Sequence, residues 1–163
     1  MSERVDVREY VGIDRTDVIE LIVSIQRDEF GVAITAAQQP DLSDVEHYYQ
    51  TGNGNFWVAQ HDGRVVGTIA LKDIGAAGAA LRKMFVSPGY RGRDHGTAGR
   101  LLRTALAWSR ARGLATIHLG TTAQFLAAHR FYEKNGFVEV ARSQLPPSFP
   151  VMDVDTKFYR YSL

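Results

Sequence analysis

The spacing of apolar residues divides the first third of the chain into a strand, a helix and a looped segment. Val5 and Val7 alternate with charged residues, a pattern typical of a half-buried strand. Apolar positions within residues 18–25 then recur at helical spacing behind Asp14, a suitable N-cap residue. A proline and a Gly- and Asn-rich segment follow, so we expect a loop, a short helix over residues 43–49 and a second loop.

The central segments predict a hairpin and then a strand-helix-strand unit. Two β-prone runs flank the Asp-Gly pair at 62–63, which is typical of a type I′ hairpin turn. After the loop GAAGAA (75–80), the run LRKMFV (81–86) predicts a strand. Apolar residues from 98 to 106 lie on one face of a helix that we expect to end near Gly113, before a strand at ATIHLGT (115–121). Such a unit forms a right-handed crossover with parallel strands, so this helix begins at the carboxyl end of the sheet.

The last part of the chain predicts a helix over 123–135 ended by Gly136, a strand over 137–142, a Pro-rich loop and a final strand in KFYRYSL (157–163). The predicted element order is β-α-α-β-β-β-α-β-α-β-β. The predicted fold class is therefore α+β, with one domain over residues 1–163.

Composition narrows the function classes. With 45% hydrophobic and 23% charged residues, the chain matches a soluble domain with one core. The net charge of +1 gives no strong attraction for nucleic acid or an anionic membrane. The chain has no cysteine, which excludes thiolate nucleophiles, and its five histidines show no metal-ligand spacing, so we expect no metal. No apolar stretch matches a signal peptide or membrane span, so we expect a cytoplasmic protein.

The stretch RGRDHGTAGRLL (91–102) joins a predicted strand to a predicted helix. The first N–H groups of a helix are unpaired and carry the positive end of its dipole, and small residues let a ligand approach them. The pattern indicates a phosphate or pyrophosphate site, although glycine spacing alone leaves a loop with solvated arginines equally open. Neither a Walker A loop nor G-x-G-x-x-G is present.

The wider context favours the phosphate site. Residues 93–98 fit [Q/R]-x-x-G-x-[G/A] between a strand and a helix, and AAHRFYEKNGF (127–137) follows. This arrangement resembles the GCN5-related N-acetyltransferase (GNAT) superfamily, most closely over residues 79–140. The resemblance implies a mixed, mostly antiparallel sheet flanked by helices, in which two parallel strands splay apart in a V to admit acetyl-CoA.

The resemblance also implies site residues. Tyr132 corresponds to the general acid that protonates the departing CoA thiolate, in a direct transfer to a primary amine within a ternary complex. A strand around Phe85 corresponds to the segment that binds pantetheine, the loop amides bind pyrophosphate, and Arg130 is a candidate for the 3′-phosphate. The implied acetyl-CoA-binding residues are Met84, Phe85, Val86, Arg91, Arg93, Asp94, His95, Gly96, Thr97, Ala98, Phe125 and Arg130.

The chain departs from the family pattern at two places. Arg91 and Gly92 add two residues ahead of the loop motif, which begins at Arg93. Phe125 stands seven residues before Tyr132, where the family often has an asparagine. Tyr132 also fits an amphipathic core position. His118, between two apolar strand residues, is expected to be a hydrogen-bonded structural histidine or to face the acceptor.

Several functional questions stay open in the sequence. A CoA-binding sensor without turnover is the alternative function, and nucleic-acid binding is disfavoured because the helix arginines form no single stripe. The general base is Glu29, Glu46, His47 or a chain of water molecules.

The acceptor is a small amine, an amino acid, a peptide N-terminus or a protein lysine. Residues 27–35 and 44–50 indicate a pocket able to hold a cation, with Asp153 or Asp155 in the tail available for pairing. The last strand either pairs with another copy in a homodimer or is covered within the chain.

Overall fold

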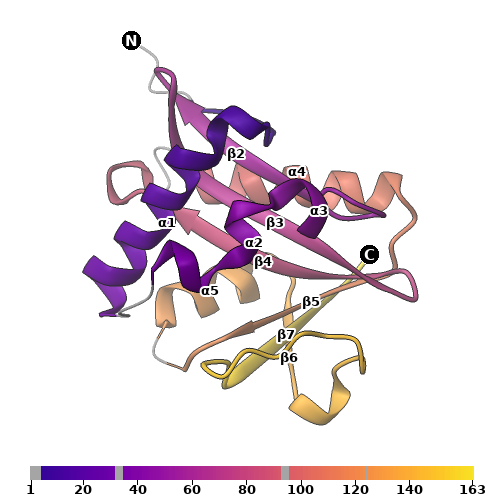
Figure 1. Cartoon of the computed structure of the whole chain (residues 1–163). Helices are drawn as coiled ribbons and strands as arrows, with labels where there is room; N and C mark the ends of the chain where they lie inside the picture. Colours follow the sequence, from indigo (N-terminus) through magenta and orange to yellow (C-terminus); the bar gives the residue numbers. More distant parts are fainter. Residues whose placement is uncertain (1–4, 32–34, 93–95, 124) are drawn as a thin grey trace.

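One mixed β-sheet organises the molecule (Figure 1). The computed structural model describes residues 5–31, 35–92, 96–123 and 125–163. Within them the sheet has seven strands in the order β1-β2-β3-β4-β5-β7-β6. The strands are β1 (Asp6–Glu9), β2 (Asn55–His61), β3 (Arg64–Gly75), β4 (Gly78–Val86), β5 (Thr116–Thr121), β6 (Val138–Val140) and β7 (Lys157–Ser162).

Helices cover both faces of this sheet (Figure 1). One face packs on α1–α3 through a core that contains Ile22, Leu42 and Tyr49, and the other packs on α4 and α5 around Leu101 and Tyr132. The helices are α1 (Arg15–Phe30), α2 (Pro40–Ser43), α3 (Val45–Tyr48), α4 (Thr97–Ala111) and α5 (Leu126–Lys134), with 3-10 turns η1 (Gly12–Asp14), η2 (Ala36–Gln38), η3 (Pro88–Tyr90) and η4 (Arg142–Gln144).

The predicted fold class and element order are confirmed, with differences in element bounds. The helix expected over 43–49 is α3, and a further short helix, α2, precedes it. The two are separate because the backbone at Asp44 leaves the helical region with φ −147° and ψ 55°. The helix expected over 123–135 begins at Leu126, and the strand expected over 137–142 spans Val138–Val140. The strand expected from residue 81 begins at Gly78, because Ala76 and Ala77 alone make the turn. Both have positive φ, 52° and 57°, as a type I′ turn requires.

The parallel strands β4 and β5 separate part of the way along their length. Pairing links Gly78 with Thr116, Ala79 with Ile117 and Ala80 with His118, and no pair follows in the described chain. Beyond that point β4 pairs with β3, and β5 pairs with β7. The expected V-shaped splay therefore opens after Ala80.

A β-bulge lies in the part of β4 that borders the splay. The pairing with β3 shifts between Thr68–Phe85 and Ala70–Arg82, and Lys83 in between has φ 55°. The Thr68 hydroxyl donates a hydrogen bond to the Lys83 carbonyl at 2.6 Å and so holds the bulge in place.

The last strand is internal to the sheet. β7 pairs with β5 on one side and with β6 on the other, so the strands at the sheet edges are β1 and β6. Of the two expectations for this strand, the structure shows the one in which it is covered within the chain. β6 covers residues 158–160 of β7.

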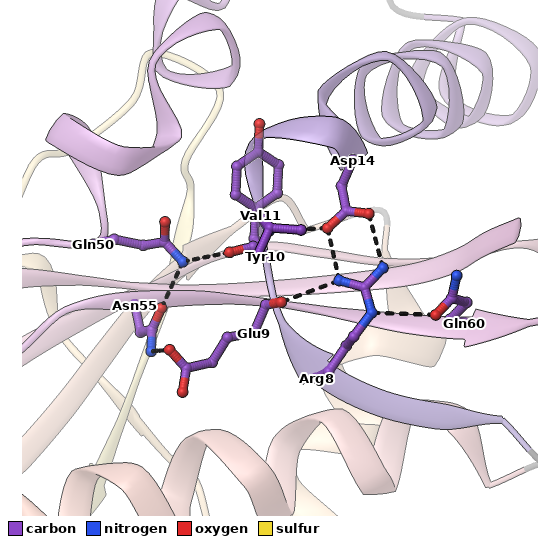
Figure 2. Close-up of polar contacts among 8 residues, drawn as sticks. All are labelled: Arg8, Glu9, Tyr10, Val11, Asp14, Gln50, Asn55 and Gln60. Carbon is purple, nitrogen blue, oxygen red and sulfur yellow. Dashed lines mark hydrogen bonds and ion pairs between the residues drawn. The ribbon is translucent and has the colours of Figure 1, made fainter. Parts of the chain in front are cut away.

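Polar contacts tie α1 and α3 to the sheet (Figure 2). The Arg8 guanidinium donates two hydrogen bonds to Asp14, at 2.8 and 2.9 Å, and Asp14 accepts the Val11 N–H at 2.9 Å. Asp14 stands at the expected N-cap position of α1, but its side chain serves Arg8 and Val11 rather than capping the helix. The Gln50 amide donates to the Tyr10 carbonyl at 2.9 Å. These contacts fix the helices that cover the splay.

No helix in the described chain is long and apolar enough to cross a membrane.

Candidate active site

The N-terminus of α4 lies at the mouth of the splay, and its first N–H groups have no acceptor among the described residues. Arg93, Asp94 and His95 lie outside the described residues. Gly96 is the N-cap with φ 62°, and no described carbonyl accepts a backbone hydrogen bond from the N–H groups of residues 97–99. The Thr97 hydroxyl is also buried without a partner in the described residues. Gly96, Thr97 and Ala98 thus form a site suited to an anion.

Arg91 is engaged within the chain. Its guanidinium pairs with Glu29 at 2.6 and 2.9 Å and donates to the Val86 carbonyl at 2.8 Å. Arg91 therefore fastens the end of α1 to the end of β4, and a phosphate that binds Arg91 has to share it with Glu29. The same ion pair occupies Glu29, one of the three residues considered as general base.

The β4 segment that borders the splay presents its side chains to both cores. Met84 packs against the α4–α5 cluster, Phe85 packs against the α1–α3 cluster, and Val86 is buried. On the side facing β5, this segment has no strand partner among the described residues. Backbone groups are therefore available there for a bound molecule.

Tyr132 lies on α5 beneath the splay. It is 7% exposed and belongs to the same cluster as Leu81, Met84 and Leu119, which come from β4 and β5. Burial raises the pKa of its hydroxyl well above the usual 10.0, so the group keeps its proton at neutral pH. Its hydroxyl makes no hydrogen bond with any described residue.

The other residues singled out on α5 lie toward its surface. Phe125 is half-buried at the N-cap of α5, where its N–H donates to the Thr122 carbonyl at 3.2 Å. Arg130 is exposed. His129 turns inward, and its Nε2 lies 2.7 Å from the Thr122 carbonyl.

Glu46 and His47 do not reach this site. Glu46 lies against Gly12, and the exposed His47 pairs with Asp44 at 2.8 Å. Asp44 raises the pKa of His47 through this hydrogen bond. In the described structure neither side chain is hydrogen-bonded to β4 or α5.

Two adjacent cations on β4, Arg82 and Lys83, were missed in the sequence analysis. The Lys83 ammonium lies 3.4 Å from the Asp41 carboxylate and donates to the Gln39 side chain at 2.8 Å. Asp41 also accepts the Tyr49 hydroxyl at 2.6 Å. Burial lowers the pKa of Lys83. The signal for Arg82 and Lys83 in the sequence was an Arg-Lys pair that interrupts an otherwise apolar strand.

Arg82 contacts neutral groups. It donates to the Tyr48 hydroxyl at 3.0 Å, and its second terminal nitrogen lies 3.6 Å from the Met152 sulfur. Asp155 accepts the Met152 N–H at 2.9 Å, and burial raises the pKa of Asp155. Asp153 is exposed, so of the two tail carboxylates only Asp155 turns toward this region.

His118 differs from its expected structural role. It is 4% exposed, and its Nδ1 has no hydrogen-bond partner in the described structure. Its ring packs edge-on against Phe149, 6.4 Å between centroids. Burial and the charge of Arg160 lower its pKa, so the ring is neutral at pH 7.

Comparison with known proteins identifies related sequences and folds. The profile of the acetyltransferase (GNAT) family matches residues 19–137. An acetyltransferase of the GNAT family from Staphylococcus aureus Mu50 is 38% identical, with a TM-score of 0.91 over 97% of this chain and 98% of the other. The PaiA N-acetyltransferase of Thermoplasma acidophilum, solved with coenzyme A, is 20% identical and shares the fold, with a TM-score of 0.74 over 100% of both chains.

A curated relative, N-acetylaspartate synthetase of Xenopus tropicalis, is 39% identical over 109 residues. The match covers 66% of this chain and 40% of that relative, so the chain spans about two fifths of its length.

Proposed function

The chain belongs to the acetyltransferase (GNAT) family, and from this premise we propose that it transfers an acetyl group from acetyl-CoA to a primary amine. The observation that carries the proposal is the splay between β4 and β5, with the N-terminus of α4 at its mouth. Strand edges and helix N–H groups without a partner among the described residues meet there. A molecule with an amide-containing arm and a phosphate end needs both kinds of group.

The residues at the splay fit acetyl-CoA. The N–H groups of residues 97–99, which no described carbonyl accepts, and the buried Thr97 hydroxyl would hold its pyrophosphate. The side of residues 84–86 that no described strand pairs with would bind the pantetheine arm. Phe125 offers an apolar contact where the family often has an amide. Arg130 is exposed and free of any ion pair with a described residue, as a ligand for the 3′-phosphate must be.

The proposed chemistry needs an acyl donor, an oxyanion donor and an acid. Acetyl-CoA supplies the activated acetyl group as a thioester. A backbone N–H within residues 84–86 would stabilise the negative charge that develops on the carbonyl oxygen. Tyr132 would donate its proton to the leaving sulfur, because burial keeps the hydroxyl protonated and no described residue competes for it. The proposed transfer is direct, from donor to amine in a ternary complex.

The helices α1–α3 and the loop between η4 and β7 form the side of the splay that we assign to the acceptor. Of the residues considered as general base, Glu29 is paired with Arg91, and Glu46 and His47 lie elsewhere on the surface. A chain of water molecules is the base that the geometry favours among those considered.

The first experiment measures thiol release from acetyl-CoA by the wild type and by Tyr132→Phe. The acceptors are pooled primary amines, amino acids and peptides, with L-aspartate included because of the name of the frog relative. We expect amine-dependent release that falls about 100-fold or more in the variant, since general acids contribute at least this much. Acetyl-CoA affinity, measured by calorimetry, should not change.

Tyr161→Phe is the matched control, because that hydroxyl accepts a hydrogen bond from Arg110 at 2.8 Å, near the end of α4 remote from its N-terminus. Its activity should equal that of the wild type. Binding of acetyl-CoA without release to any acceptor would favour a CoA-binding sensor instead. Absence of acetyl-CoA binding would overturn the proposal.

A further inference from the structure

Arg82 is a half-buried cation on which two nearby carboxylates, Asp41 and Asp155, act without a direct ion pair. In the described part of the chain it forms no ion pair within 4.0 Å, and its contacts are the Tyr48 hydroxyl and the Met152 sulfur. The Tyr48 ring lies below the guanidinium, 5.8 Å from its centroid. Removing a guanidinium from water without a counter-charge costs free energy, which an anion bound at this position would offset.

No neighbouring carboxylate bonds Arg82 directly in the described part of the chain. Lys83 and Asp41 form an ion pair with side chains 10% and 8% exposed, and Asp41 acts on Arg82 only at longer range. Asp155 lies near enough to Arg82 to feel its charge, but it bonds the Met152 N–H and makes no ion pair with Arg82. The Arg82 guanidinium therefore has donors that no described carboxylate uses.

The position of Arg82 connects this charge to the proposed reaction. It lies two residues beyond Ala80, where β4 and β5 part, and two residues before Met84, where the segment proposed to bind acetyl-CoA begins. An anion on its guanidinium would lie beside the stretch of β4 that joins the point of separation to the segment proposed to bind acetyl-CoA.

We infer that Arg82 binds a carboxylate of the acceptor, so that the acceptor is a free amino acid rather than a simple amine or a protein lysine. This inference rests on the proposed function and names the substrate class of the same site. The planar guanidinium suits a carboxylate because it can donate two parallel hydrogen bonds to it.

The carboxylate of Asp155, across the splay from Arg82, would suit the ammonium group of an amino acid. Asp155 lies directly against Gly120 of β5, whereas Arg82 extends from β4. The site thus presents a cation from β4 and a carboxylate near β5, and Met152 contacts both of them. A zwitterion, with its ammonium toward Asp155 and its carboxylate toward Arg82, has the complementary arrangement.

The test compares acceptors that differ only in the carboxylate. Rates of thiol release are measured for glycine, L-alanine and L-aspartate, for their methyl esters, and for methylamine and ethylamine. We expect kcat/KM for at least one free amino acid to exceed that of its ester by about 10-fold or more, the strength of a hydrogen-bonded ion pair.

Variants assign this preference to Arg82. Arg82→Gln should raise the KM for the preferred amino acid by about 10- to 100-fold and leave the KM for acetyl-CoA unchanged. Arg82→Lys should restore part of the loss. Arg142→Gln removes a charge from an exposed position near Asp155 and should change neither constant. Thermal melting confirms that each variant is folded.

The outcomes separate this inference from the proposed function. Acetylation of esters and simple amines as fast as of amino acids, or a preference that survives in Arg82→Gln, would overturn the inference while the transferase proposal stands. If no amine is acetylated, calorimetry of the same amino acids with the CoA-loaded protein decides. Binding that is lost in Arg82→Gln supports the inference, and equal or absent binding overturns it.

Discussion

Three ion pairs join elements of this protein that are separate in the sequence. An ion pair of this kind joins β1 to the start of α1, another joins β4 to α2, and a third joins the turn after β4 to the end of α1. The pairs are Arg8–Asp14, Lys83–Asp41 and Arg91–Glu29. Each neutralises a desolvated charge and also fixes one element on another, so their loss should affect stability and geometry together.

Replacing Asp14 tests this at one residue. The hydrogen bond from Arg8 lowers the pKa of Asp14 below its usual 3.8, so the ionised carboxylate stabilises the folded state. Asp14→Asn should lower the free energy of unfolding at pH 7 by about 1 to 2 kcal/mol, toward the lower end because Arg8 is one-third exposed. Urea denaturation measures the difference.

The pH dependence has a defined sign. Because the folded-state pKa of Asp14 is lowered, its contribution is complete above pH 3.8 and is lost as the pH falls through the folded-state value. The difference between wild type and Asp14→Asn should therefore shrink on acidification. Asp17→Asn, at an exposed position of the same helix, is the control, and an equal loss there would contradict the assignment.

Single residues differ in how far the sequence predicts their roles. Tyr132 and the loop before α4 follow from local motifs, and the structure leaves their proposed roles to be tested. Arg82 is different, because its hydrogen-bond partners are the neutral residues Tyr48 and Met152, which lie 34 and 70 residues away in the chain. The local sequence shows that a cation stands at position 82, but it does not show that no described carboxylate pairs with it directly.

Among the larger elements, the two hairpin turns show the same geometry made from different residues. Asp62 and Gly63 have φ of 50° and 74°, which confirms the predicted type I′ turn. Ala76 and Ala77 adopt the same region without a glycine, and a non-glycine residue is strained there.

Ala77→Gly should therefore stabilise the protein. We expect the free energy of unfolding to rise by about 0.5 to 1 kcal/mol, the left-handed strain less the added chain entropy of glycine. Ala107→Gly, at an exposed position inside α4, is the control and should lower the same quantity by about 1 kcal/mol. Destabilisation by Ala77→Gly would contradict this account of the turn.

Element boundaries and neighbours were harder to predict than element types. The loop predicted at residues 75–80 was too long, because the turn consists of two alanines only. Alanine rarely occupies a type I′ turn, so this run of small residues indicated a longer loop. The place of β7 between β5 and β6 is a long-range choice that no local pattern carries. By contrast, the crossover from β4 through α4 to β5 followed from chain order alone.

For the molecule as a whole, the splay leaves the sheet divided between two strand groups. β1–β4 form one antiparallel group, and β5, β7 and β6 form the other. Three residue pairs between β4 and β5 join the groups along the sheet. A molecule bound in the splay would contact both groups and should stabilise their association.

Acetyl-CoA should accordingly stabilise the folded protein and protect a defined region. At a concentration of 100 times its dissociation constant we expect about 2.7 kcal/mol of added stability. Hydrogen exchange should slow in residues 81–86 and 96–100 and remain unchanged in β1. Uniform protection, or none at the splay, would contradict the assigned binding region.

The internal position of β7 has a consequence for synthesis on the ribosome. Strands β1 to β4 can pair with their neighbours as soon as they emerge, because each follows its partner along the chain. β5 lacks its antiparallel partner, and β6 lacks the strand it pairs with, until residues 157–162 have left the exit tunnel. The wall of the splay formed by β5 is therefore completed after the wall formed by β4, once β7 has emerged.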